Sequence, residues 1–296
     1  MLCRATILPR KALPRAPGAM LPRFFPRAML STSSSESNTS RVYASTSETP
    51  LVRTEFLADK RIFVLHLLGE ETQDNRLTHT LIQQGLVPAL RDVRRQWYKW
   101  VKANDTADGA ALVTTALPTS KIFSNGLDLL NALKDPNFFN ESLNVLSREL
   151  LTFPIPTVAA MGGHAFAAGF TFALAHDYRV MNAQRGYACM NEIEFGAHIP
   201  RGMLGVIQSV ASSASLQRKI VLEGHRFTAA EAMQDGLVDA TAEGAEATFQ
   251  AALALAEKLR SRCAKDAWQI NREQLKREAI EMQYEPPRAQ IKTEVK

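Results

Sequence analysis

The sequence predicts an α/β fold, and three observations support that prediction. Short apolar runs with the composition of buried strands alternate with segments of helical length. The chain has 296 residues, of which 46% are hydrophobic and 22% charged, as expected for a globular protein with a full core. The segment 246–283 has the pattern of one or two amphipathic helices. Strands separated by helices indicate an α/β fold with crossover connections.

The N-terminal residues have the composition of an organelle import signal. Residues 1–35 hold six of the 35 basic residues and no acidic residue. Their prolines and broken apolar runs argue against a secretory signal or a membrane span. We therefore predict a mitochondrial targeting leader over residues 1–33 and a location in the mitochondrial matrix; a disordered basic tail is the alternative.

Residues 34–52 are rich in Ser and Thr and are expected to form a disordered linker, because such a segment has little apolar area to bury. A folded core is expected over residues 53–245, followed by a C-terminal helical region over residues 246–296. Strands are expected at residues 61–69, 111–117, 156–163 and 178–182. The helical segment 75–103 contains Gly85 and Pro88, which should break or kink it.

Charge and cysteine content exclude several functional classes. The net charge is +5, but beyond residue 35 the chain has 29 basic and 30 acidic residues, so nucleic acid is not an expected partner. The basic and aromatic stretch "LRDVRRQWYKWVK" is read as a solvated helix face with two core tryptophans, with RNA binding as the alternative. Three cysteines are too few for a disulfide framework or a plausible metal cluster, so no metal site is expected.

Two segments combine a strand end, small residues and the start of a helix. In the first, Ala167, Ala168 and Gly169 lead into a helix expected near Phe170, whose first-turn N–H groups lack intrahelical partners. In the second, residues 121–132, an Asn-Gly turn precedes a helical pattern. Backbone donors from two such turns can converge on one oxygen and form an oxyanion hole. Close packing of chain against chain is the alternative explanation of the small residues.

Four motifs taken together resemble the crotonase superfamily of enoyl-CoA hydratases and isomerases. They are "FSNGLDL", "IPTVAAMGGHAFAAGFTFALAHDYRVM", "MNEIEFG" and "GHRFTAAEAMQDGLVD", and they occur in the family's order and spacing over about residues 55–245. The resemblance implies a spiral of ββα units with a C-terminal helical region. It also implies an acyl-CoA thioester substrate and assembly as a homotrimer or homohexamer.

The resemblance assigns the oxyanion-hole amides to Leu127 and Ala168. Substrate binding is implied for Ser124, Asn125, Gly126, Phe166, Gly169 and Phe195. Many family members have three glycines where this chain has Ala167, Ala168 and Gly169. Alanine still supplies a backbone donor, provided that the local backbone does not demand a positive φ.

The carboxylates separate the family's reactions. Hydratases of the superfamily use two glutamates; here Thr171 stands at the first position and Glu192 at the second. One carboxylate is suited to moving a proton between carbons, and poorly suited to activating and splitting water. The spacing to Gly196 favours Glu192 over the neighbouring Glu194, and His198 is left without a role.

The motifs "MNEIEFG" and "DNRLT" are similar to those of mitochondrial Δ3,Δ2-enoyl-CoA isomerases. The expected activity is therefore isomerisation of a 3-enoyl-CoA in fatty-acid β-oxidation, with Glu192 as the base and with no metal or separate cofactor. A hydratase or another acyl-CoA lyase is one alternative. A non-catalytic or RNA-binding relative is the other.

Overall fold

The computed structural model describes residues 39–265 and 267–284, and it has an α/β architecture built on two sheets. The larger sheet has the strand order β1-β2-β3-β4-β6-β8-β10, and the smaller has the order β5-β7-β9. The strands are β1 (Thr39–Ala44), β2 (Pro50–Leu57), β3 (Ile62–Leu67), β4 (Ala111–Ala116), β5 (Ile122–Ser124), β6 (Thr157–Met161), β7 (His164–Phe166), β8 (Tyr178–Asn182), β9 (Ala188–Cys189) and β10 (Ala240–Ala242).

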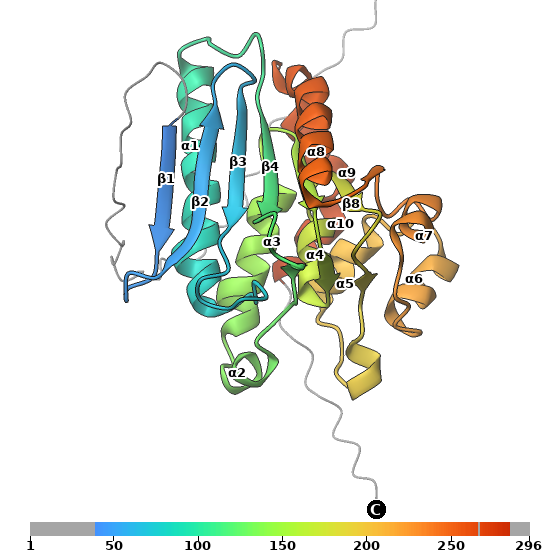
Figure 1. The fold of residues 1–296 in the computed structure, drawn as a ribbon. Helices are drawn as coiled ribbons and strands as arrows, with labels where there is room; N and C mark the ends of the chain where they lie inside the picture. The colour runs from blue at the N-terminus through green and yellow to red at the C-terminus, as the bar shows by residue number, and fades with distance from the viewer. Residues whose placement is uncertain (1–38, 266, 285–296) are drawn as a thin grey trace, which may run out of the picture.

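Helices cover both faces of the larger sheet (Figure 1). They are α1 (Val87–Lys102), α2 (Leu129–Lys134), α3 (Asn144–Leu151), α4 (Ala168–Leu174), α5 (Arg201–Gln208), α6 (Ala214–Val221), α7 (Ala229–Gln234), α8 (Ala245–Arg260), α9 (Ala267–Leu275) and α10 (Arg277–Glu281). Two π-helices, Leu81–Leu86 and Phe139–Leu143, precede α1 and α3. Short 3-10 helices occupy Glu192–Phe195, Ser261–Cys263 and Met282–Tyr284.

From β4 onward the chain forms a spiral of repeated strand–strand–helix units. A strand of the larger sheet is followed by a strand of the smaller sheet and then by a helix, in the successions β4-β5-α2, β6-β7-α4 and β8-β9-3-10 helix. Neighbouring strands in this part of both sheets are parallel. The carboxyl ends of β5, β7 and β9 therefore lie at one edge of the smaller sheet. This arrangement confirms the predicted spiral of ββα units.

The sheet separates two apolar layers. Ile62 and Val64 of β3 belong to the cluster that packs under α8, whereas Phe63 and Leu65 belong to the larger cluster that includes α1. Burial on both faces explains why the central strands are continuous apolar runs. The expected strands at 61–69, 111–117, 156–163 and 178–182 correspond to β3, β4, β6 and β8.

The prediction of a disordered linker over residues 34–52 is wrong from residue 39 onward. β1 pairs antiparallel with β2, so the core begins before the predicted boundary at residue 53. Tyr43, Leu51 and Val52 are buried, and the Tyr43 hydroxyl donates to Asp92 Oδ2 at 2.8 Å. A few buried apolar side chains are enough for this segment, because the neighbouring strand β3 and the helices offer them a surface to pack on. The predicted leader lies outside the described residues.

The segment expected to break near Gly85 and Pro88 continues as helix through a π-helical stretch that ends at Leu86. Pro88 falls in the first turn of α1, directly after this π-helical stretch. Of the two tryptophans, Trp97 is buried and Trp100 packs against the core. Arg94 pairs with Glu149 at 3.0 Å. Helix α1 therefore packs on the core through its tryptophans, as the sequence pattern predicted.

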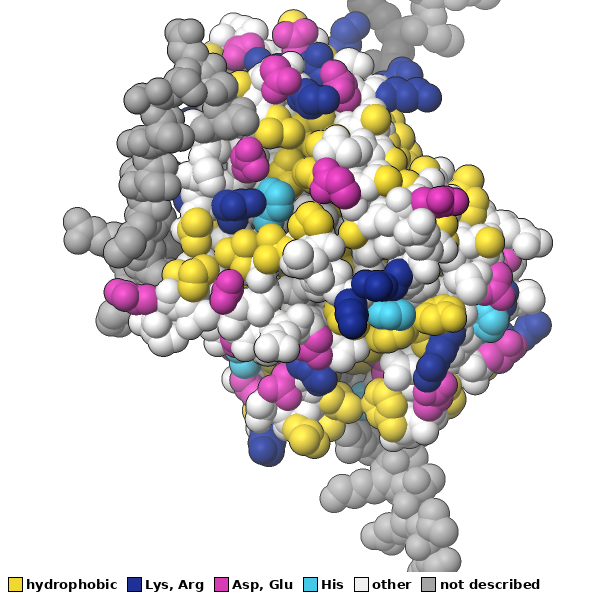
Figure 2. Space-filling model, in the orientation of Figure 1, with side chains coloured by type: hydrophobic (Ala, Val, Ile, Leu, Met, Phe, Trp, Pro, Cys, Tyr) yellow, Lys and Arg dark blue, Asp and Glu magenta, His cyan; other side chains and the backbone are white. Residues whose placement is uncertain are grey.

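The face of the molecule drawn in Figure 2 intersperses basic and acidic side chains among apolar ones. No helix in the described part of the chain is both long and apolar enough to cross a membrane.

Candidate active site

Three segments of the chain meet at the carboxyl edge of the smaller sheet. Leu127 follows β5, Ala168 follows β7 and Glu192 follows β9. The β5 and β7 turns touch: a Cβ added to Gly126 would lie 2.8 Å from Ala167 Cβ and 3.2 Å from Ala168 N. Gly126 also has φ +81°, so both its backbone and its surroundings require glycine. The two turns that sequence patterns suggested as donors are therefore in direct contact.

The two residues of the predicted oxyanion hole differ in exposure: Leu127 is half-buried and Ala168 is fully buried. Among the described residues, no acceptor is found for the backbone N–H of Leu127 or of Ala168. Ala168 is the first residue of α4, where an N–H has no intrahelical partner. Leu127 is held by its bridge to Leu77, whose N–H donates to Gly126 O at 2.7 Å. The arrangement supplies two backbone donors from two adjacent turns, which is the composition of an oxyanion hole.

Of the two alanines that stand where many family members have glycine, Ala167 has a positive φ and Ala168 does not. The backbone of Ala167 has φ +51° and ψ −127°, whereas Ala168 is helical. A non-glycine residue in such a conformation costs on the order of 1–3 kcal/mol. The strain thus falls on the residue before the donor, and the donor N–H itself keeps ordinary helical geometry.

The "DNRLT" segment braces the β5 turn. Asn125 donates from its backbone N–H to Asp74 O at 3.0 Å and from Nδ2 to Asp74 Oδ2 at 2.9 Å. The Ser124 hydroxyl donates to Asn75 O at 2.8 Å, and Asn75 Nδ2 donates to Ile122 O at 3.2 Å. The side chains of Ser124 and Asn125 are therefore engaged in holding the turn that presents Leu127.

A cavity of about 230 Å³ lies beside this edge and contains both Leu127 and Glu192 in its walls. Of the predicted substrate-binding residues, Phe195 lines it. The others lie outside its walls: Ser124, Asn125, Gly126, Phe166 and Gly169. Gly169 serves close packing, because an added Cβ would lie 2.2 Å from Ser124 O. Phe166 stacks on His164 with ring centroids 5.2 Å apart.

Most of the apolar wall of this cavity comes from residues that no sequence motif marks. Leu133 of α2, Phe139 of the second π-helix and Met203 of α5 line the cavity. Phe139 and Met203 lie 64 residues apart in the sequence, so no local pattern links them. The exposed His198, left without a role from sequence, also lies in the wall. Phe170, in the first turn of α4, is fully buried in the core.

Glu192 has the electrostatics of a reactive carboxyl group. It is only 7% exposed, and its Oε2 is buried with no hydrogen-bond partner in the part of the chain that the structure describes. Burial raises the pKa of Glu192 to about 7, against a smaller opposing effect of a backbone hydrogen bond. Glu194, in contrast, has a side chain that is 47% exposed and pairs with Arg226 at 3.6 Å. Of these two neighbours, Glu192 is the one that lines the cavity.

Comparison with known proteins places the chain in a family. The model of the enoyl-CoA hydratase/isomerase family matches residues 100–293. The chain belongs to this family. Over 202 residues it is 31% identical to the peroxisomal enoyl-CoA delta isomerase 1 of Arabidopsis thaliana, a match that covers 67% of this chain and 79% of the relative. This family membership confirms the resemblance to the crotonase superfamily that the four motifs suggested.

Other relatives of this enoyl-CoA hydratase/isomerase family member carry different names. Over 129 residues it is 34% identical to the mitochondrial enoyl-CoA hydratase domain-containing protein 2 of Mus musculus, covering 41% of each chain. A solved structure of an enoyl-CoA isomerase from Mycobacterium tuberculosis superimposes with a TM-score of 0.63 at 23% identity, covering 75% of this chain and 90% of that one. The structural likeness establishes the fold, and the reaction has to be argued from the site.

Proposed function

We propose that the protein is a Δ3,Δ2-enoyl-CoA isomerase, which moves a double bond from C3 to C2 of an enoyl-CoA in fatty-acid β-oxidation. One observation carries the proposal: Glu192, buried and with a pKa near 7, is the one carboxylate among the described residues that line the cavity beside Leu127. A general base is most effective when its pKa lies near the working pH. The isomerase named among the relatives supports the same reaction class.

The reaction moves one proton between two carbons. Deprotonated Glu192 takes a proton from C2, and the electron pair of that C–H bond delocalises into the thioester carbonyl to give a dienolate. The N–H groups of Leu127 and Ala168 donate to the negative thioester oxygen. Protonated Glu192 then returns the proton at C4 while the double bond forms between C2 and C3. Atoms and charges balance without a metal or a separate cofactor, since CoA is part of the substrate.

A hydratase is the second candidate, because several relatives carry that name. Hydration requires activation of water as well as protonation of carbon, and superfamily hydratases divide these tasks between two glutamates. Here Thr171 occupies the first position and donates its hydroxyl to Ala168 O at 3.0 Å. That hydroxyl is buried and engaged, so the geometry supports the isomerase over the hydratase.

Assembly and location are also proposals. We expect a homotrimer or homohexamer, as the resemblance implies. The named relatives include both peroxisomal and mitochondrial proteins. The composition of residues 1–35 supports the mitochondrial matrix.

Two substrates distinguish the candidates. The purified protein should convert a 3-enoyl-CoA to the conjugated 2-enoyl-CoA, followed by the absorbance of the conjugated thioester, and should hydrate crotonyl-CoA far more slowly. A screen over short, medium and long 3-enoyl-CoAs then defines chain-length preference. Efficient hydration of crotonyl-CoA without isomerisation would favour the hydratase.

A pair of variants tests the base. Glu192→Gln keeps the shape of the side chain but removes the proton acceptor, so turnover should fall by about 10²-fold to 10⁴-fold. Glu194→Gln makes the same change two residues away on an exposed side chain and should stay active. The assignment is wrong if Glu194→Gln is the inactive variant. The single-base mechanism is wrong if both variants stay active.

A further inference from the structure

A second cavity, of about 660 Å³, lies at the opposite end of α4 from the candidate active site, and we call it the α4-end cavity. Its walls come from the residues that follow α4, from the start of β8, from the end of α5 and from α9. Four basic residues line it: Arg179, Arg262, Arg272 and Lys276. The mechanism proposed for Glu192 uses none of them.

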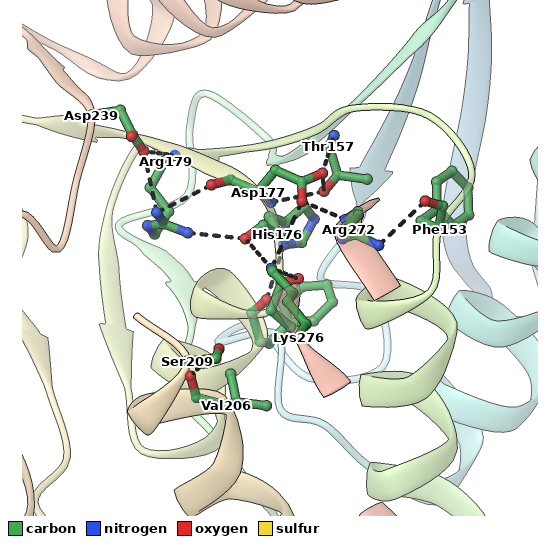
Figure 3. Close-up of polar contacts among 12 residues, drawn as sticks. Phe153, Thr157, His176, Asp177, Arg179, Val206, Ser209, Asp239, Arg272 and Lys276 are labelled. Carbon is green, nitrogen blue, oxygen red and sulfur yellow. Dashed lines mark hydrogen bonds and ion pairs between the residues drawn. The ribbon is translucent and has the colours of Figure 1, made fainter. Parts of the chain in front are cut away.

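An ion-pair network, drawn in Figure 3, contributes Asp177, Arg179, Arg272 and Lys276 to the walls of this cavity. Arg272 Nε donates to Asp177 Oδ1, and Lys276 Nζ lies 3.7 Å from the same oxygen. Arg179 Nη2 lies 3.3 Å from Asp239 Oδ2, and its Nε donates to Leu237 O at 2.6 Å. The network therefore holds three cations close together with two carboxylates.

Positive charge exceeds negative charge at this site. With Arg262, four cations stand against Asp177 and Asp239. Arg262 is exposed, and no ion pair of its guanidinium is found in the described part of the chain. Burial, together with the neighbouring Arg272 and Arg179, lowers the pKa of Lys276 to about 7 against the opposing effect of Asp177. The surplus is therefore two positive charges when Lys276 is protonated and one when it is neutral.

The unsatisfied polar groups at the cavity are donors. Arg272 is 5% exposed, and its Nη2 has no hydrogen-bond partner among the described residues. Trp268 Nε1 is likewise buried and unpartnered there. Leaving a buried donor unpaired costs free energy, most of all for a charged group. The site thus has two unpaired donors and surplus positive charge, which are the requirements for binding an anion.

We propose that the α4-end cavity binds a phosphate group, carried on a small organic molecule, through Arg262, Arg272 and Trp268. A phosphomonoester has a charge of about −1.5 to −2 near neutral pH, which matches the surplus, and offers three acceptor oxygens. Arginine and phosphate also match in geometry. The volume and the side walls of Tyr178, Val210 and Leu275 accommodate an apolar body attached to the phosphate. This proposal is independent of the reaction at Glu192.

Calorimetric titration of the full chain in chloride buffer at constant ionic strength tests the proposal. Phenyl phosphate supplies a phosphate on an aromatic body and lacks the adenine of CoA, and inorganic phosphate supplies the anion alone. We expect both to bind, phenyl phosphate more tightly. Equal affinities would assign the site to free phosphate, whereas binding of neither overturns the proposal.

Three variants locate the binding. Arg262→Glu reverses an exposed charge at the cavity and should weaken both ligands by about tenfold, a difference of about 1.4 kcal/mol. Trp268→Phe removes one donor and should weaken them by about threefold to tenfold. Lys258→Glu makes the same change of charge on the exposed face of α8, outside the cavity, and should bind normally. Binding that Arg262→Glu and Trp268→Phe leave unchanged lies elsewhere and contradicts the assignment.

Discussion

Two buried carboxylates lie near opposite ends of the short helix α4, and their pKa values are shifted in opposite directions. Glu192 lies beside the turn that begins α4, is 7% exposed and has a pKa raised to about 7 by burial. Asp177 follows the end of α4 and has a side chain that is 9% exposed. Burial raises its pKa, but Arg272 and Lys276 outweigh that effect, so the pKa of Asp177 is lowered (Figure 3).

The difference shows that partners, rather than burial, decide what a buried carboxylate does. Both groups are removed from water, which disfavours the charged form. Asp177 gains cations and hydrogen bonds from Thr157, and its charge becomes part of the structure. Glu192 Oε2 gains no partner among the described residues, so both its protonation states are accessible near neutral pH. A perturbed pKa in a cavity is typical of a reactive group.

The largest expected effect on stability comes from removing the paired carboxylate of Asp177. Asp177→Asn leaves Arg272 and Lys276 buried without their carboxylate, and should lower the free energy of unfolding by about 3–5 kcal/mol. Urea unfolding at fixed protein concentration measures this. Glu281→Gln is the control: its pair with Arg277 has side chains that are 63% and 71% exposed, so its loss should cost about 0.5 kcal/mol or less. Equal costs for the two variants would contradict the comparison.

Removing the unpaired carboxylate of Glu192 should raise the free energy of unfolding rather than lower it. The folded pKa of Glu192, about 7, lies above its ordinary value of 4.5, so the stability present below pH 4.5 is lost as the pH rises through 7. Glu192→Gln carries no such penalty and should be more stable than the natural protein at pH 8, by on the order of 1–3 kcal/mol. The advantage should shrink at pH 5. Glu194→Gln should change stability by no more than about 0.5 kcal/mol at either pH.

The same group sets the expected pH dependence of the proposed reaction. Turnover of a 3-enoyl-CoA requires deprotonated Glu192, so it should fall about tenfold per pH unit below 7 and level off above it. Initial rates at saturating substrate between pH 5 and 8 provide the measurement. A rate that is flat between pH 5 and 7 would show that no group of this pKa acts as the base.

The smallest effect concerns backbone strain at the start of α4. Ala167→Gly relieves a positive φ and should stabilise the protein by on the order of 1 kcal/mol, after the larger unfolded-state entropy of glycine is subtracted. Ala168→Gly is the matched control one residue later, where the backbone is helical, and should destabilise by about 1 kcal/mol. Thermal unfolding of both variants is sufficient. Destabilisation by Ala167→Gly would show that the strain is not real.

Sequence patterns predicted those strands that can be recognised from their own residues alone. β3, β4, β6 and β8 are buried on both faces and so appear as continuous apolar runs. β1 was missed because it is an edge strand with few buried side chains, whose stability depends on pairing with β2. At the candidate site, the motifs singled out Leu127, Ala168 and Glu192, and the structure brings these three residues to one edge of the smaller sheet. The contact between Arg272 and Asp177 joins residues 95 positions apart and has no local signal.

The spiral also determines how this scaffold responds to mutation. The two proposed oxygen-binding groups are main-chain amides, at Leu127 and Ala168, which most substitutions leave in place. The proposed proton-transfer group is one side chain at the end of the next turn of the spiral, and a single codon change can remove or replace it. Recognition of the thioester is therefore robust to mutation while the proton chemistry is easily altered. A fold with this division of labour can acquire new acyl-CoA reactions by changing positions such as Thr171 and Glu192 without losing its substrate.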